Sequence, residues 1–173
     1  MRYLSSLFHC LDRNKTIAYL TFSVFFQISV AYADQLLGKV VGVADGDTVT
    51  VLDSNEKEYK VRLAGIDAPE KKQAFGQISK QHLSDLVYGK QVIVEWRKRD
   101  KYSRIVGKVI VDGNDACLDQ VDSGLAWHYK QYAGEQSEED RKAYANAEVS
   151  ARSVRKGLWK DGQPIPPWEF RHH

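Results

Sequence analysis

The sequence predicts an α+β fold, mainly a small β-barrel of five strands that carries three α-helices. Three observations support this prediction. Short segments rich in β-branched residues alternate with turn residues, a helical segment separates the third from the fourth of them, and two more helical segments follow the fifth.

The first three strands are predicted to form a meander. The segments "GKVVGVA" and "TVTVL" flank Asp45-Gly46, a dipeptide that is typical of a hairpin turn. A second turn cluster, "DSNE" at 53–56, leads into the third strand, "KEYKVRLAGI". The next segment, "DAPEKKQAFG", is predicted to be a loop because Pro69 and Gly76 interrupt it.

A helix and two further strands come next. The segment "QISKQHLSDLVYG" has apolar residues at helical spacing and stops at Gly89. The predicted inward positions are Ile78, His82 or Leu83, Leu86 and Val87. The strands "KQVIVEW" and "RIVGKVIV" are joined by the basic loop "RKRDKYS".

Two helices complete the domain. The short segment "DACLDQVDSG" is predicted to point Leu118 and Val121 inward, and a capping box at 137–140 opens a long helix that ends at Gly157. The predicted buried stripe of the long helix is Ala143, Ala147, Ala151, Val154 and Leu158. Three strands, a helix, two strands and two helices form the OB-fold layout, a five-stranded Greek-key barrel.

Residues 1–33 are predicted to be a secretory signal peptide. A basic start is followed by an uncharged apolar segment, which ends in the small-x-small pattern Ala31-Tyr32-Ala33. The alternative is an uncleaved anchor, although the segment is near the lower limit for spanning a bilayer. We therefore expect a domain at 34–160, a tail at 161–173 docked by Trp168 and Phe170, and export to the periplasm or the medium without stable membrane association.

The charge and cysteine content of the chain limit what can be inferred about nucleic-acid binding and disulfides. The chain has 25 basic and 23 acidic side chains, and residues 1–33 hold three and one of them, so the remainder is formally neutral. Net charge therefore does not favour nucleic acid, and a nucleic-acid site must be argued from local clusters. Removal of the signal peptide leaves Cys117 alone, without an internal disulfide partner, and we expect it to be a small buried apolar residue.

Carboxylates and an arginine gather at the ends of the second and third strands. The segment "RLAGIDAPE" supplies Arg62, Asp67 and Glu70, and Gly65 offers a bend that could bring Arg62 and Asp67 to one side. Asp47 adds a third carboxylate, unless it only helps the hairpin turn. Carboxylates without histidine or thiolate suit a hard cation, calcium or magnesium.

A second arginine, Arg104, stands immediately before the fifth strand. Guanidinium groups fork onto phosphate oxygens, so two arginines beside a cation held by carboxylates suit a phosphodiester. Each motif alone has an ordinary reading: a turn, an acidic loop or a solvated hairpin tip. Their combination at strand ends favours a functional site.

The motifs "DGDTV", "VRLAGIDAPE", "DKYSR", "SGLAW" and "RKGLW" resemble those of the staphylococcal (micrococcal) nuclease family, the thermonucleases, from about Leu36 to Trp159. The resemblance implies an OB-fold endonuclease that uses one calcium ion and cuts DNA and RNA to leave 3'-phosphate ends. We also expect the protein to be a monomer. Departures are Ala68 and Ser103, where the family often has threonine and glycine, and Lys130, which replaces one tyrosine of the nucleotide site.

The resemblance also implies a role for each site residue. Asp47 and Asp67 would bind calcium through their carboxylates, and Ala68 through its carbonyl. Glu70 would act as general base on the attacking water. The implied phosphate ligands are Arg62 and Arg104, and the implied substrate contacts are Lys101, Tyr102 and Tyr132.

Two other classes of protein remain open at this stage. A non-catalytic OB module that binds nucleic acid predicts erosion of the acidic residues, but all three acids and both arginines are present. An envelope OB protein that binds a small ligand or sugar would not need the arginine pair. Metal-dependent cleavage of an oligonucleotide would separate the three classes.

Overall fold

A computed structural model describes residues 34–172, so the predicted signal peptide at 1–33 lies outside the described residues. The strands are β1 (Asp34–Val43), β2 (Thr48–Leu52), β3 (Glu58–Leu63), β4 (Ile66–Asp67), β5 (Gln91–Arg99), β6 (Ile105–Val111), β7 (Asn114–Asp115) and β8 (Trp127–His128). The α-helices are α1 (Gly76–Val87), α2 (Ala116–Asp122), α3 (Glu138–Ser153) and the short α4 (Pro167–Phe170). Two 3₁₀ helices are η1 (Lys130–Glu135) and η2 (Gly157–Lys160).

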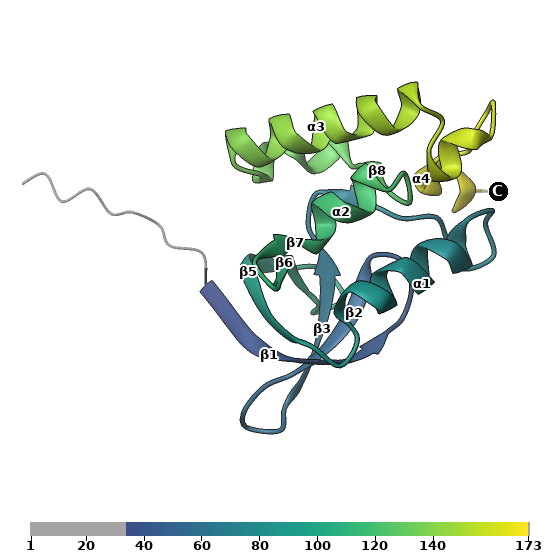
Figure 1. Cartoon of the computed structure of the whole chain (residues 1–173). Coiled ribbons are helices and arrows are strands. Elements are labelled where there is room, and N and C mark those ends of the chain that lie inside the picture. Colours follow the sequence, from purple (N-terminus) through teal and green to yellow (C-terminus); the bar gives the residue numbers. More distant parts are fainter. Residues whose placement is uncertain (1–33, 173) are drawn as a thin grey trace, which may run out of the picture. The chain divides into compact units, whose positions relative to one another are not determined.

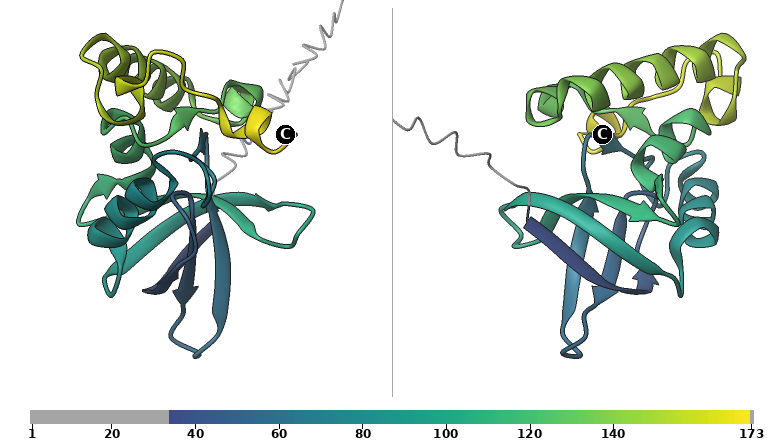
Figure 2. Two further views of the ribbon diagram at one scale, coloured as in Figure 1. Left: turned by 90° about the vertical axis from the view of Figure 1, so that its right-hand side faces the viewer. Right: turned by 60° about the vertical axis from the view of Figure 1, so that its left-hand side comes forward.

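Strands β1, β2, β3, β5 and β6 close into a barrel (Figure 1). Their order is β3-β2-β1-β5-β6 with antiparallel neighbours, and a parallel pairing of β3 with β6 joins the two ends. Strands β4 and β8 form a separate antiparallel pair. Helices α2 and α3 lie over one end of the barrel (Figures 1 and 2). The predicted OB-type α+β fold is confirmed, with α4 as an additional short helix.

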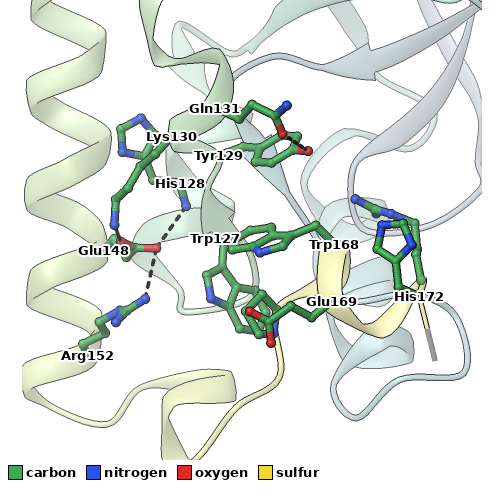
Figure 3. Close-up of a pocket in the computed structure, with 12 residues that line it drawn as sticks. Trp127, His128, Tyr129, Lys130, Gln131, Glu148, Arg152, Trp168, Glu169 and His172 are labelled. Carbon is green, nitrogen blue, oxygen red and sulfur yellow. Dashed lines mark hydrogen bonds and ion pairs between the residues drawn. The ribbon is translucent and has the colours of Figure 1, made fainter.

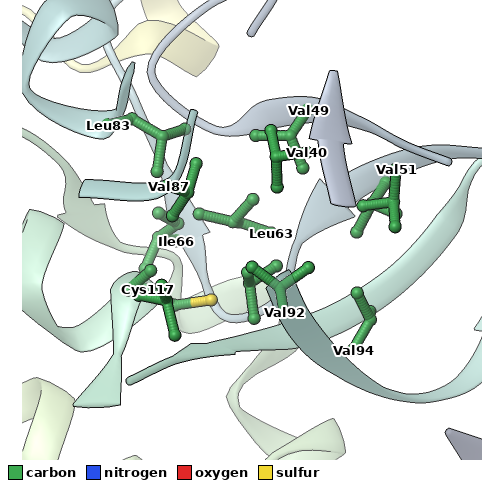
Figure 4. Close-up of a cluster of buried hydrophobic side chains, with 14 of the residues drawn as sticks. Val40, Val49, Val51, Leu63, Ile66, Leu83, Val87, Val92, Val94 and Cys117 are labelled. Carbon is green, nitrogen blue, oxygen red and sulfur yellow. The ribbon is translucent and has the colours of Figure 1, made fainter. Parts of the chain in front are cut away.

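The barrel interior is filled by alternate side chains of the strands. In β6 every second residue is buried, which is the pattern of a strand with one face on the core. Figure 4 shows branched aliphatic side chains meeting in this interior, with Cys117 among them. Cys117 is fully buried, and burial raises the pKa of its thiol well above the ordinary value, so it is the inert apolar residue that was expected.

Two predicted helical stripes need correction. In α1 the inward side chains include Leu83 and Val87, whereas Ile78 is 55% exposed. Helix α3 ends at Ser153, so Val154 is 68% exposed and Leu158 is buried from η2 instead. The helix stops early because Arg155 has a φ of 51°, and the amide of Lys156 turns back onto the carbonyl of Ala151.

The glycine between Asp45 and Asp47 is required by space, not by turn conformation. Gly46 is not among the residues with positive φ. A Cβ atom on it would lie 1.9 Å from Ser79 Oγ and 2.8 Å from the Cβ of Ala68, and its carbonyl accepts a hydrogen bond from the buried Gln120. The connection between β1 and β2 is therefore packed tightly against α1, and this contact fixes the position of Asp47.

Replacing Gly46 with alanine should destabilise the protein by about 1 to 3 kcal/mol, because the added methyl group overpacks a closed contact. Urea unfolding followed by circular dichroism measures the change. Gly134→Ala is a matched control, since a Cβ there has no neighbour within 4 Å. Equal stability of the two variants would contradict this account of Gly46.

Among residues 34–172, the helices are all too short or too polar to cross a bilayer.

Candidate functional site

All nine residues singled out in the sequence line one cleft of about 690 Å³. The cleft is bordered by the β1–β2 connection, the end of β3, the loop before α1, the β5–β6 hairpin and η1. Its predicted members are Asp47, Arg62, Asp67, Ala68, Glu70, Lys101, Tyr102, Arg104 and Tyr132. The structure therefore brings the whole predicted set together, while the chemical role of each residue stays a prediction.

Strand pairing and a bend in the chain bring the carboxylates of Asp47 and Asp67 into contact with Arg62. Thr48 pairs with Arg62 across β2 and β3, so Asp47 stands next to Arg62. Gly65, at a φ of 74°, turns the chain between β3 and β4 and brings Asp67 back to the same side. Arg62 Nη2 then lies 3.1 Å from Asp47 Oδ2 and 2.9 Å from Asp67 Oδ1.

Asp47 is a buried carboxylate, and its surroundings disfavour the charged form. Burial raises its pKa to about 7 against the lowering effect of Arg62, and the negative charges of Asp45 and Asp67 add to the increase. Asp47 Oδ2 accepts a hydrogen bond from the amide of Ala68 at 2.8 Å. Asp45 is the residue that serves the turn, since its Oδ1 accepts the amide of Asp47. Asp47 itself is thus free to face the cleft.

Glu70 is the more accessible carboxylate, with 39% of its side chain exposed. It follows Pro69 in a loop that Gln73 fixes, because Gln73 Oε1 accepts the amide of Glu70. Its Oε1 lies 2.7 Å from Nη1 of Arg171, a residue near the C-terminus. A carboxylate with this access can reach a water molecule in the cleft.

The β5–β6 hairpin, which extends from the barrel in Figure 2, carries the second predicted arginine. Arg104 Nε donates to Asp100 Oδ2 at 2.7 Å. Partial burial alone would raise the pKa of Asp100, but hydrogen bonds from the Arg104 side chain and from the amides of Arg104 and Tyr102 lower it overall. Asp100 therefore stays charged and orients Arg104. Lys101 and Tyr102 are exposed at the hairpin tip.

Among the cleft residues that were not predicted from the sequence are Tyr129 and Arg171. The Tyr129 ring lies 5.0 Å from that of Tyr132, and burial together with the charge of Asp67 raises the pKa of Tyr129. Lys130, which seemed to occupy the position of the second tyrosine, instead pairs with Glu148. A shift of one residue in "HYKQY" would have identified Tyr129, but no local signal pointed to Arg171.

The oxygen donors of the cleft fit a hard cation. Asp47 Oδ2 and Asp67 Oδ1 both lie within 3.1 Å of one cationic nitrogen, so the two carboxylates face a common position that carries positive charge. Within residues 34–172 no group of three or more His, Cys, Asp and Glu side chains is arranged to hold a metal ion. Two carboxylates therefore need a main-chain oxygen, water or substrate to complete a calcium shell.

Comparison with known proteins shows the family of the chain. The family described as Staphylococcal nuclease homologue matches residues 60–161. The chain is 41% identical over 148 residues to a protein named "Uncharacterized endonuclease" from Haemophilus influenzae, which covers 86% of this chain and 80% of the relative. It is 38% identical over 150 residues to a protein named "Micrococcal nuclease" from Shigella flexneri, which covers 82% and 83% of the two chains. The chain therefore belongs to the staphylococcal nuclease family, and it is a phosphodiester hydrolase of the nuclease class.

Proposed function

We propose that this protein is an exported, calcium-dependent endonuclease that hydrolyses DNA and RNA as a monomer and leaves 3'-phosphate ends. One observation carries the proposal: Asp47 and Asp67 converge on Arg62 in a cleft that also holds Glu70 and Arg104. Export rests on the signal-peptide pattern of residues 1–33 alone.

Glu70 takes the proton of the attacking water. The oxygen of that water forms a bond to phosphorus, the bond from phosphorus to the 5'-oxygen breaks, and the 5'-oxygen takes up a proton from solvent water as it leaves. A general base of this kind contributes about 10²- to 10⁴-fold to a rate. The remaining exposure of Glu70, 39% of its side chain, leaves room for water beside it.

Arg62 and Arg104 hold the phosphate and balance the charge that grows on its oxygens. Both are oriented before substrate arrives: Arg62 by the carbonyl of Leu63 and by Asp67, and Arg104 by Asp100. Groups fixed in this way need little reorganisation during the reaction. Such preorganisation of charged groups is the main source of electrostatic catalysis. Tyr132, Tyr102 and Lys101 line the same cleft, and we expect them to contact sugar, base or neighbouring phosphates.

Calcium bound by Asp47, Asp67 and the carbonyl of Ala68 would supply Lewis-acid polarisation of the phosphate. With so few protein ligands, we expect a dissociation constant on the order of 0.1 to 1 mM in the absence of nucleic acid. Magnesium, which needs a smaller octahedral shell, should support cleavage poorly.

The test is cleavage of quenched DNA and RNA oligonucleotides by the purified protein, with calcium, with magnesium and with excess chelator. We expect cleavage with calcium only, and products with 3'-phosphate ends by mass spectrometry. Full activity in chelator would refute the calcium proposal, and binding without cleavage under every condition would instead indicate a non-catalytic nucleic-acid-binding module.

Replacing Arg62 or Arg104 with lysine should lower kcat/KM at least about tenfold, although the charge is kept. A lysine offers one point of charge and cannot contact phosphate and carboxylates through a planar fork. Steady-state kinetics on one oligonucleotide measure the effect. Arg97→Lys is the matched control, because Arg97 is exposed on β5 and does not line the cleft. Rates within about twofold of wild type would remove the two arginines from the mechanism.

A further inference from the structure

The C-terminal segment places an arginine on the carboxylates of the cleft. Arg171 Nη2 lies 2.8 Å from Asp67 Oδ2, and Arg171 Nη1 lies 3.3 Å from Asp67 Oδ1 and 2.7 Å from Glu70 Oε1. Arg62, on β3, donates to Asp67 Oδ1 at 2.9 Å. Both oxygens of the buried Asp67 are therefore engaged by guanidinium groups that come from residues 62 and 171.

The segment that carries Arg171 is anchored at several points. Pro167 is buried, and Trp168 stacks on Tyr129 with ring centroids 5.4 Å apart and an interplanar angle of 11°. Figure 3 shows Trp168 lying beside Tyr129 and Trp127 in a second cavity, of about 710 Å³, which shares Tyr129 and Arg171 with the cleft. Helix α4 thus keeps Arg171 next to the cleft, and the Arg171 side chain remains 41% exposed to solvent.

Gln73 links this segment to the loop of the predicted general base. Its Oε1 accepts the amide of Glu70, and its Nε2 donates to the carbonyl of Ile165. The backbone of Glu70 is thereby tied to the tail, and its carboxylate is tied to Arg171. The tail is consequently linked to the main chain of Glu70 through Gln73, and it contacts the Glu70 side chain directly through Arg171.

Charge balance explains why a third arginine is useful here. Asp47, Asp67 and Glu70 bring three negative charges, while Arg104 is already paired with Asp100. Arg62 alone does not balance the three carboxylates, and unbalanced charge is costly on the two that are buried, Asp47 and Asp67. Arg171 reduces this excess, and it does so by binding the same oxygen lone pairs that a cation would use.

We propose that Arg171 is a positioning residue of the site: its guanidinium holds Asp67 and Glu70 in place and is the group that an incoming cation displaces from Asp67. The identity of that cation as calcium rests on the proposed function. Two cationic groups cannot share the same lone pairs, so each weakens the binding of the other, and the effect is reciprocal. Arg171 thereby raises the calcium concentration that is needed to occupy the site.

The test compares calcium affinity in wild type, Arg171→Gln and Arg171→Lys without nucleic acid. A calcium titration followed by amide NMR shifts of Asp67 and Ala68 gives the dissociation constant and checks folding in one experiment. We expect about tenfold tighter binding for Arg171→Gln, the scale of a partly exposed charged hydrogen bond, and an intermediate value for Arg171→Lys. Arg152→Gln is the control, because Arg152 pairs with Glu148 and is similarly exposed, 48% against 41%.

A second readout separates displacement from a merely structural role. Arg171→Gln should lower the melting temperature in chelator, and the loss should shrink in saturating calcium because calcium replaces the missing charge. A purely structural arginine would give the same loss in both conditions. Equal calcium affinity of wild type and Arg171→Gln, with shifts still located at Asp67 and Ala68, would overturn this inference alone. Absence of calcium shifts at the cleft in every protein would overturn it together with the proposed calcium site.

Discussion

Replacing Glu70 with glutamine should lower the cleavage rate by about 10²- to 10⁴-fold, the contribution typical of a general base. Glutamine keeps the size of glutamate and can still accept a hydrogen bond from Arg171, but it cannot take a proton from water. Binding of nucleic acid should survive, because Arg62 and Arg104 are untouched and the change removes one negative charge near a phosphate. Single-turnover cleavage and binding of an uncleavable oligonucleotide should be measured on the same preparation.

The matched control for this variant is Glu135→Gln. Glu135 lines the same cleft, pairs with Lys98 and has 45% of its side chain exposed, close to the 39% of Glu70. A loss of activity in Glu70→Gln and not in Glu135→Gln would assign the effect to proton transfer and not to the charge of the cleft. If Glu70→Gln folds and cuts at a rate near wild type, Glu70 is not the base and the mechanism proposed above is wrong.

Replacing Asp47 with asparagine should nearly abolish calcium-dependent cleavage and at the same time stabilise the fold at pH 8. Activity is lost because one of only two proposed carboxylate ligands disappears, and a neutral amide is a weaker ligand for a hard cation. Stability is gained because a buried, crowded negative charge is removed. This opposite movement of activity and stability is what distinguishes a functional carboxylate from a structural one.

The pH dependence of the stability gain follows from the raised pKa of Asp47. Its ordinary value is 3.8 and its value in the fold is about 7, so the folded protein binds this proton more tightly than the unfolded chain. Well below the unfolded pKa both states are protonated, and the burial of Asp47 costs little. Stability is lost as the pH rises from about 4 to about 7, and above pH 7 the cost levels off at about 4 kcal/mol, at 1.4 kcal/mol per pKa unit.

Urea unfolding of wild type and Asp47→Asn between pH 4 and 8, in chelator, measures this difference. It should be small at pH 4 and largest at pH 8. Asp85→Asn, which changes an exposed carboxylate on α1, serves as the control and should show little dependence. A difference that is constant across this range would contradict the burial argument for Asp47.

The strand segments and five of the site residues, Asp47, Arg62, Asp67, Glu70 and Arg104, could be predicted from local patterns. The other four, Ala68, Lys101, Tyr102 and Tyr132, were implied by the family resemblance. The strands are recognised by apolar residues at every second position, which are buried in the structure. The carboxylates and the arginine of the site lie at or just beyond strand ends: Asp47, Arg62, Asp67 and Glu70. Residues close to the ends of paired strands meet whatever the rest of the chain does. Gly65, which was expected to bend the chain, indeed has the positive φ that the bend needs.

The end of the long helix and the need for glycine at position 46 could not be read in this way. The spacing of Val154 fits the helical stripe, yet a left-handed residue at Arg155 ends the helix before it. Asp45-Gly46 has the composition of a turn, but the glycine is needed because Ser79 approaches it from α1. Both outcomes depend on which surfaces pack together, and sequence spacing does not contain that information.

By itself, the sequence determined the barrel and the acidic and arginine side chains at its strand ends, because short-range periodicity and strand pairing decide both. Only the tertiary structure decided that Tyr129 faces the cleft and that Arg171 binds Asp67, a residue 104 positions earlier in the chain. That contact exists because α4 is anchored on Tyr129 by Trp168, far from Asp67 in sequence. Long-range packing of this kind leaves no local signal, since it depends on the completed surface of the domain against which the tail lies.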